Sequence, residues 1–121
     1  MDLTRKIILP EHVHEAEPPT FWLRPYLAGD NATIEAAKPS PLPETDEARF
    51  QAAVDVAPLA CAIGIKRFEN LTEDGEPIPW PEDISERQEI VRRRFPLWWS
   101  LKLARIYQAA GEIAQEEERK G

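Results

Sequence analysis

The chain has 121 residues, of which 42% are hydrophobic and 31% are charged, and its net charge at pH 7 is -7. This length suits a single domain with its own core, which we expect to span residues 1–121. The negative charge argues against nucleic acid as the main partner, because binding phosphate groups requires a basic surface. No apolar run approaches the roughly 18 residues of a membrane span, so we expect a cytoplasmic protein without a membrane partner.

Two short apolar segments near the N-terminus predict a β-hairpin. The isoleucines within residues 5–10 favour an extended strand, and the aromatic and apolar residues 20–24 favour a second one. The polar residues 11–19 between them predict a loop. An isolated hairpin is marginally stable, so we expect a helix to cover one of its faces.

A short helix is expected from Asp30 to about residue 37, and a flexible segment is expected after it, at about residues 38–44. Prolines occupy every second position there, at 39, 41 and 43, and they exclude regular structure. Such a spacing favours an extended, polyproline-like arm.

The first long helix is expected to begin after Thr45, a suitable N-cap with acidic residues in the first turn, and to end at Gly64. Pro58 predicts a kink or a restart, since an interior proline costs about 3 kcal/mol. Helical spacing predicts a buried face, which consists of Phe50, Ala53, Val54, Ala57 and Cys61. Cys61 is the only cysteine, which excludes an internal disulfide, and its apolar surroundings predict a buried, unreactive thiol.

Turn and cap signals organise the next part of the chain. Residues 65–68 fit either a short strand or the start of a loop, and the Asp74-Gly75 pair predicts a tight turn. Asp83 or Ser85 is expected to open another helix, with a capping-box pattern at Ser85.

The last helix is expected at about residues 97–118, with Pro96 in its first turn. Its apolar stripe consists of Trp99, Leu103, Ile106, Ala110 and Ile113. Glutamates near the helix end oppose the helix dipole, so we expect the chain to fray at about residues 116–121. The elements together predict an α+β, mainly α fold, with a small N-terminal β-hairpin packed on about three to four helices.

Catalytic and metal-binding motifs are poorly represented. His12 and His14 lie close to three glutamates, a set that suits several divalent metals, but no second cluster offers further ligands. The carboxylates are scattered and no nucleophile has a base beside it, so we expect no enzyme activity, no bound metal and no cofactor. The acidic residues around Asp74 lack the ligand spacing of an EF-hand and fit a plain turn.

Aromatic and basic residues are the candidates for contacts with a partner. Trp98 and Leu101 fall toward the polar side of the last helix, where the chain itself is expected to cover them; left exposed, they would mark a partner surface. Trp80 lies between two prolines and suits either a loop clamp or a contact. The full set of candidate partner-binding residues is Trp22, Trp80, Arg92, Arg93, Arg94, Trp98 and Leu101.

Three segments resemble the tail assembly chaperones of long-tailed, siphovirus-like bacteriophages. Residues 21–27 read Phe-Trp-Leu-Arg-Pro-Tyr-Leu and are similar to the "LRPLT"-type segment of that family. Residues 63–79 resemble its "gi..f.NL.deDG.piP" stretch, and residues 96–120 resemble its "P.L...LA..I" helix with charges at the end. The chain differs from this pattern in residues 39–43 and in the Trp98-Trp99 pair.

The resemblance implies a small, mainly helical, non-enzymatic protein of a bacteriophage or prophage. Such proteins coat the tape-measure protein during tail assembly in the host cytoplasm, recruit tail-tube subunits, and are absent from the finished particle. Tape-measure and tail-tube proteins are therefore the expected partners, and self-association stays open.

Two alternatives belong to other classes. A structural head–tail connector or another virion component would form a permanent oligomer, which sizing chromatography detects. A small metal-dependent enzyme would need His12 and His14, so a double alanine variant with full function would exclude it.

Overall fold

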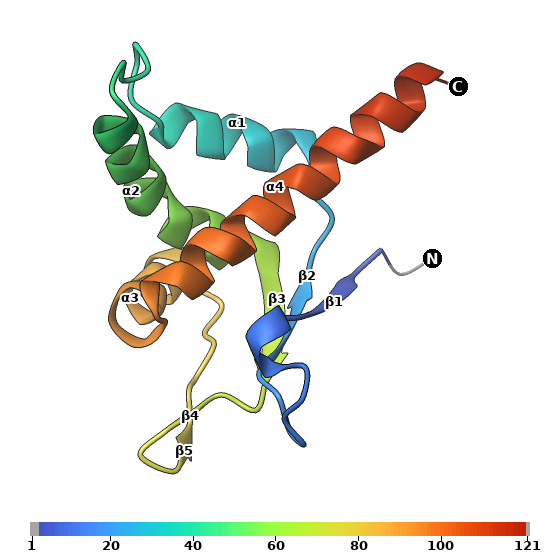
Figure 1. The fold of residues 1–121 in the computed structure, drawn as a ribbon, viewed down its shortest axis with the longest axis vertical. Coiled ribbons are helices and arrows are strands. Elements are labelled where there is room, and N and C mark those ends of the chain that lie inside the picture. Colours follow the sequence, from blue (N-terminus) through green and yellow to red (C-terminus); the bar gives the residue numbers. More distant parts are fainter. Residues whose placement is uncertain (1–2, 121) are drawn as a thin grey trace.

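The computed structural model describes the backbone of residues 3–120 and the side chains of residues 3–109. Four α-helices and a small three-stranded antiparallel sheet make up this part of the chain (Figure 1). The predicted α+β, mainly α fold is therefore confirmed. Helix α4, Leu97–Lys120, runs diagonally across the molecule from the side of α3 to the C-terminus (Figure 1).

The sheet has the order β1-β2-β3. Strands β1, Arg5–Ile8, and β2, Thr20–Leu23, form the predicted hairpin, and a single 3-10 turn, Pro10–His12, lies in the loop between them. Strand β3, Ile65–Glu69, pairs antiparallel with β2 and makes residues 65–68 a strand rather than the start of a loop. The sheet buries Phe21 and leaves Trp22 partly exposed on its other face.

Helix α1, Ala28–Ala37, starts two residues before Asp30, the expected first residue. The Asp30 carboxylate accepts a hydrogen bond from the backbone N–H of Leu27 at 3.2 Å and so stabilises the first turn from inside it. The three prolines that follow exclude regular structure from the segment before α2, as predicted.

Helix α2, Asp46–Gly64, begins after Thr45, whose hydroxyl accepts a hydrogen bond from the Ala48 N–H at 3.1 Å. It runs through Pro58 as one helix, so the predicted restart does not occur. Its predicted buried face is correct for Ala57 and Cys61 but wrong for the first half of the helix, because Phe50 is 56% exposed there. Ala53 is exposed too, and Val54 is half-buried. Helical spacing identifies an apolar face but not whether another element covers it.

A short hairpin of β4, Thr72–Glu73, and β5, Glu76–Pro77, carries the predicted turn. Asp74 and Gly75 have φ values of 53° and 81°. Two-residue hairpin turns of type I′ require a positive φ at both of these central positions. Helix α3, Ile84–Arg94, begins after Asp83, whose carboxylate accepts a hydrogen bond from the Glu86 N–H at 3.0 Å. Asp83, and not Ser85, is the cap.

Helix α4 begins immediately after Pro96, close to the predicted bound. Leu103 of the predicted stripe is buried, and Trp99 and Ile106 are half-buried. The side chains of Ala110 and Ile113 lie outside the residues whose side chains the structure describes. The expected fraying at residues 116–121 stays a prediction.

Aromatic rings connect the sheet to the helices. Phe21 of β2 lies 5.9 Å from Phe95 and 5.8 Å from Trp99, measured between ring centroids. Phe68 of β3 lies 5.1 Å from Trp80 in the same way. Aromatic contacts at these distances contribute about 0.5–1.5 kcal/mol beyond the area they bury. These five aromatic side chains thus belong to the core of the chain or pack against it.

Candidate binding groove between α2 and α4

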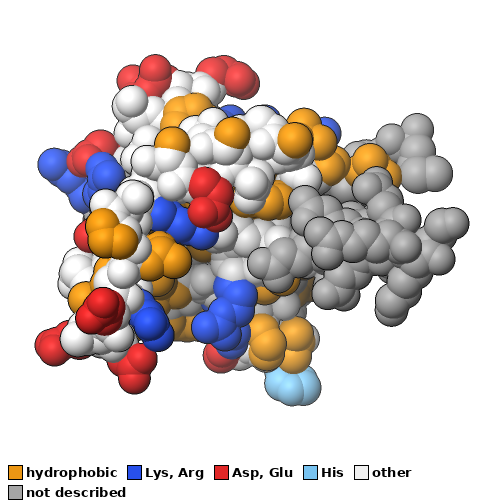
Figure 2. Space-filling view, turned by 90° about the horizontal axis from the view of Figure 1, so that it is seen from above, with side chains coloured by type: hydrophobic (Ala, Val, Ile, Leu, Met, Phe, Trp, Pro, Cys, Tyr) orange, Lys and Arg blue, Asp and Glu red, His pale blue; other side chains and the backbone are white. Residues whose placement is uncertain are grey.

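An open groove of about 490 Å³ lies between the first half of α2, the outward side of α4 and the proline-rich segment. We call it the α2–α4 groove. Its lining residues are Lys38, Pro39, Leu42, Phe50, Ala52, Ala53, Val56, Ala57, Leu101, Ala104, Arg105, Gln108 and Ala109. Elsewhere too, hydrophobic side chains reach the surface between charged ones (Figure 2).

The lining combines small and large apolar side chains. Five of its residues are alanines, of which Ala57 and Ala104 are buried at its base. Leu42 and Phe50 stand at the surface, 68% and 56% exposed, and Leu101 is half-buried. Large apolar side chains left to water beside a depression are typical of a surface that binds a partner.

The charged side chains of the groove are basic. Lys38 and Arg105 contribute to the lining, and among the residues with described side chains no aspartate or glutamate does. Lys38 forms an ion pair with Glu35 at 2.7 Å. Arg105 is exposed and has no ion pair within the described part of the chain. The groove is therefore locally positive on a chain whose net charge is -7.

One wall of the groove is the proline-rich segment, which is fastened at both ends. The Arg49 guanidinium donates a hydrogen bond to the carbonyl oxygen of Pro43 at 2.9 Å, and Lys38 follows α1 directly. The predicted flexibility of residues 38–44 stays a prediction.

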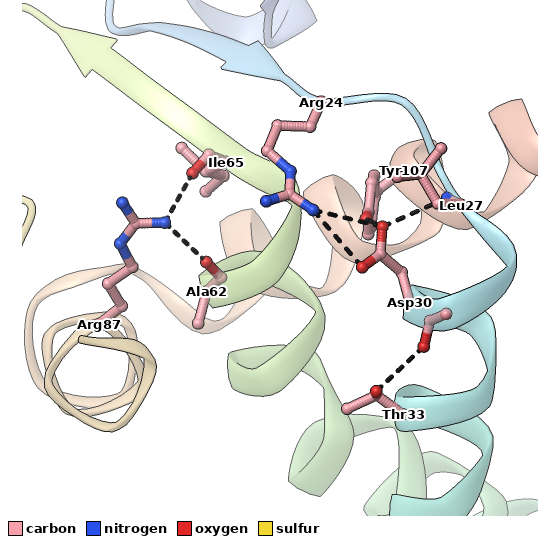
Figure 3. Close-up of polar contacts among 9 residues, drawn as sticks. Arg24, Leu27, Asp30, Thr33, Ala62, Ile65, Arg87 and Tyr107 are labelled. Carbon is pink, nitrogen blue, oxygen red and sulfur yellow. Dashed lines mark hydrogen bonds and ion pairs between the residues drawn. The ribbon is translucent and has the colours of Figure 1, made fainter. Parts of the chain in front are cut away.

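A partly buried polar network joins α1 to α4 and to the end of β2 (Figure 3). The Asp30 carboxylate accepts hydrogen bonds from the Tyr107 hydroxyl at 2.8 Å and from the Arg24 guanidinium at 3.4 Å. Burial, and then the neighbouring Asp30 carboxylate, raises the pKa of the Tyr107 hydroxyl far above its ordinary value. Each member of this network has a partner in the chain, so the network links α1 to α4 and to the end of β2.

Gly64 allows Tyr107 to reach this network. A Cβ atom at Gly64 would lie 2.7 Å from the Tyr107 ring, closer than real side chains approach. The backbone carbonyl of Gly64 also accepts a hydrogen bond from the Arg24 N–H at 2.8 Å. The close approach of α2 to α4 therefore depends on this glycine.

A second polar contact closes the C-terminal end of α2. The Arg87 guanidinium, on α3, points at this end and donates hydrogen bonds to the carbonyl oxygens of Ala62 at 3.1 Å and Ile65 at 3.4 Å (Figure 3). It also donates one to Pro81. Burial lowers the pKa of this guanidinium, which nevertheless stays protonated at neutral pH. The guanidinium N–H groups bond carbonyls that have no partner within the helix, and the positive charge interacts favourably with the helix dipole.

Trp80 and Trp22, two of the predicted contact residues, pack within the chain. The Trp80 indole donates a hydrogen bond to the Ile65 carbonyl at 3.0 Å, and its ring stacks against the core. Of the two roles considered for Trp80, these contacts fit a clamp that fixes its loop to the core. Trp22 lies on the outer face of the sheet, with the Arg67 guanidinium 3.7 Å above its ring centroid. Neither lies in the α2–α4 groove.

The predicted basic cluster on α3 is exposed, and its members form ion pairs within the chain. Arg92 and Arg93 both pair with Glu89, at 3.0 and 3.1 Å, and Arg94 pairs with Glu73 at 3.5 Å. Exposed pairs of this kind contribute roughly 0–1 kcal/mol each. The cluster lies on another element than the groove.

Trp98 and Leu101 differ in their surroundings. Trp98 is 42% exposed, so the expectation that the chain covers it is wrong. Its ring contacts His12 at 6.2 Å and Trp99 at 5.9 Å between centroids. Leu101 is half-buried and lines the groove. Of the seven predicted contact residues, Leu101 is the one in the groove.

The histidine pair does not form a ligand cluster. The Nδ1 atom of His12 contacts the Glu15 carboxylate at 3.1 Å, and its ring packs between Trp98 and Trp99. Among the described residues, no group of three or more His, Cys, Asp or Glu side chains is arranged to hold a metal ion.

Cys61 is buried against α4, as predicted. Its thiol donates a hydrogen bond to the Ser100 carbonyl at 3.4 Å. Burial raises the pKa of the thiol to about 12, so almost no thiolate exists at neutral pH. Such a cysteine packs as a small hydrophobe and does not act as a nucleophile.

The sequence did not point to most of the groove. Phe50 was expected in the core, and Lys38 and Leu42 belong to a segment that predicted only irregular structure. A signal for Arg87 was present, because it precedes the buried Val91 by four residues and so shares its helix face. Its backbone partners lie up to 25 positions away and have no sequence signal.

Comparison of the chain with known proteins finds no similar sequence or structure. The chain matches no model of a protein family, no curated protein and no solved structure. Within the described residues, no helix combines the length and the apolar character that crossing a membrane requires.

Proposed function

We propose that this protein is a non-enzymatic tail assembly chaperone of a long-tailed bacteriophage or prophage, acting in the host cytoplasm. In this proposal the α2–α4 groove binds the tape-measure protein, and the bound chaperone recruits tail-tube subunits. The observation that carries the proposal is the open apolar groove with Leu42 and Phe50 left to water. The resemblance of residues 21–27, 63–79 and 96–120 to that family supplies the identity of the partners.

The groove provides what reversible shielding of an apolar segment requires. Covering the exposed parts of Leu42 and Phe50 contributes roughly 1–2 kcal/mol for each side chain, since more than half of each is exposed and full burial contributes about 1.5–3 kcal/mol. The alanines of the base add contact area without obstructing a ligand. Association also costs translational and side-chain freedom, which offsets part of this contribution and suits a partner that must be released on assembly.

Co-purification with the tape-measure and tail-tube proteins encoded near its gene tests the proposal. We expect the wild-type chain to capture the tape-measure protein. We expect Phe50→Asp to abolish capture, because it places a charge on the apolar wall. A second variant, Trp98→Ala with Leu101→Ala, tests the neighbouring surface of α4. The matched control is Lys66→Ala, an exposed change on β3 outside the groove.

Circular dichroism should show that each variant is folded. Capture that persists in Phe50→Asp would contradict a role of the groove. No capture by the wild type, together with a ring-sized oligomer in sizing chromatography, would favour the structural connector.

A further inference from the structure

We infer that the occupant of the α2–α4 groove is an amphipathic α-helix of a separate protein, with carboxylates beside its apolar face. This inference rests on the proposed function, since it specifies the segment that the groove binds. Three properties of the groove carry it: the sizes of its lining side chains, its lack of free backbone groups on the helices, and its charge.

The sizes of the side chains favour a helix. Ala52, Ala53 and Ala57 of α2 and Ala104 and Ala109 of α4 make a smooth base, with Phe50, Leu42 and Leu101 as larger side chains around them. Small residues allow a third helix to approach two others at the usual interaxial distance of about 8–10 Å. Larger side chains at the edge then pack into the spaces between successive turns of the incoming helix.

Hydrogen bonding gives a stronger argument against an extended occupant than the sizes of the side chains do. The groove walls from α2 and α4 are helical, so their backbone N–H and C=O groups bond within their own helices. An extended occupant would bury its backbone against side chains that are mostly apolar. It would lose hydrogen bonds to water without replacement, whereas a helix satisfies its own backbone groups.

The length of the groove sets the spacing of the apolar residues. On α2 the lining extends from Phe50 to Ala57, and on α4 from Leu101 to Ala109. At 1.5 Å per residue, each wall is roughly 10–12 Å long, about two helical turns. An occupant therefore contributes apolar residues at positions i, i+3 or i+4, and i+7.

The charge of the groove determines which residues suit the positions beside the apolar face of the occupant. Arg105 has no ion pair within the described chain, Lys38 has one exposed partner in Glu35, and none of the described side chains that line the groove is a carboxylate. A carboxylate on the occupant within reach of Arg105 gains an ion pair, and a lysine there meets a like charge. The groove therefore selects acidic over basic amphipathic helices, although the chain as a whole is acidic.

Synthetic peptides test this selection. Two peptides of about 18 residues carry identical leucines at helical spacing and either glutamate or lysine beside them, and a third carries glutamate and a central proline. Fluorescence anisotropy measures affinity, and circular dichroism measures helix gained on binding. We expect the glutamate peptide to bind and become helical, the lysine peptide to bind about tenfold more weakly, and the proline peptide to lose binding.

Reversing one charge of the protein should reverse the preference. Arg105→Glu should weaken binding of the glutamate peptide and strengthen binding of the lysine peptide. Lys66→Glu, a charge reversal at an exposed position of β3 outside the groove, controls for net charge and should alter neither by more than about twofold. Phe50→Asp should abolish binding of both peptides.

Several results would overturn the inference. They are equal affinity for the two peptides, no binding of the glutamate peptide, or binding without helix formation. A concentration-dependent dimer that Phe50→Asp dissociates would assign the groove to a second copy instead.

The inference and the proposed function fail separately. If capture of the tape-measure protein depends on Phe50 but the peptides show no charge preference, only the inference fails. If the glutamate peptide binds as expected but Phe50→Asp still captures the tape-measure protein, the proposed partner is wrong and the groove binds a helix of another protein.

Discussion

The two halves of α2 share one helix and differ in almost everything else. Residues 56–64 are buried, apart from the half-buried Leu59, between the sheet, α3 and α4. Residues 46–55 are mostly exposed, and Phe50 stands in water. The buried half is fixed by contacts to distant parts of the chain, among them Gly64 with Tyr107 and Arg87 with Ala62. The exposed half is one wall of the α2–α4 groove.

This difference separates stability from binding along a single helix. Side chains that hold the fold lie at the C-terminal end of α2, and side chains open to a partner lie nearer its N-terminal end. Substitutions in the first group should therefore unfold the protein, and substitutions in the second should change binding alone. Four predictions test that division, beginning with the largest expected effect on the free energy of unfolding.

Arg87→Met should lower the free energy of unfolding by about 3 kcal/mol, because the carbonyl oxygens of Ala62 and Pro81 lose the guanidinium as their donor. The Ile65 carbonyl loses it too and retains the Trp80 indole. Urea titration followed by circular dichroism measures the change. Arg93→Met on the same helix is the control and should change stability by less than about 0.5 kcal/mol. Equal effects of the two substitutions would disprove the role given to Arg87.

Gly64→Ala should destabilise by about 2 kcal/mol. Alanine favours helices, but its Cβ would lie 2.7 Å from the buried Tyr107 ring, and the overlap outweighs the gain. At Gly29 of α1 no atom lies within 4 Å of such a Cβ. Gly29→Ala should therefore be neutral or stabilise by up to about 1 kcal/mol. The urea midpoints of the two variants should move in opposite directions, and a shared direction would contradict the close approach of α2 and α4.

Tyr107→Phe should cost about 1.5 kcal/mol at neutral pH, since Asp30 loses the hydroxyl donor. Its effect should depend on pH. The pKa of Tyr107 is raised in the folded state, so its contribution is fully present below the ordinary value of 10.0 and is lost as the pH rises beyond it.

Urea titrations between pH 7 and about 11 measure this dependence as the difference between wild type and variant. The stability advantage of the wild type should shrink above about pH 10. Tyr26→Phe removes a more exposed hydroxyl and should show a smaller effect at neutral pH. A difference that grows with pH would show that the hydroxyl is not held protonated.

Phe50→Asp should leave the free energy of unfolding within about 0.5 kcal/mol of wild type, because its side chain is mostly in water already. The same change in the other half of the helix, Ala60→Asp, buries a charge and should prevent folding. Thermal melts of both variants compare the two halves directly. Strong destabilisation by Phe50→Asp would mean that this half also supports the core.

Local signals in the sequence were sufficient for most of the fold. Thr45 caps α2, the prolines interrupt the chain after α1, and isoleucines and aromatic residues favour the strands of the hairpin, because each signal depends on neighbours within a few positions. The polar junctions depend on distant ones. Tyr107 donates a hydrogen bond to Asp30, which lies 77 positions earlier in the sequence, and local residue spacing does not predict such a contact.

The groove was missed for a related reason. Apolar spacing placed Phe50 and Ala57 on one face of α2, which is correct for a helix. Whether a neighbouring element covers that face depends on where α4 and the proline-rich segment lie. Only the assembled structure distinguishes a core position from a binding position.

The central claim is that the α2–α4 groove is the surface that binds the tape-measure protein. Backbone amide chemical shifts of the ¹⁵N-labelled protein, followed while the captured tape-measure segment is added, test it most directly. The account predicts shifts concentrated in residues 50–57 of α2 and 101–109 of α4, and their absence in Phe50→Asp. Shifts confined to the sheet around Trp22 or to Arg92, Arg93 and Arg94 of α3, with the groove unchanged, would contradict it.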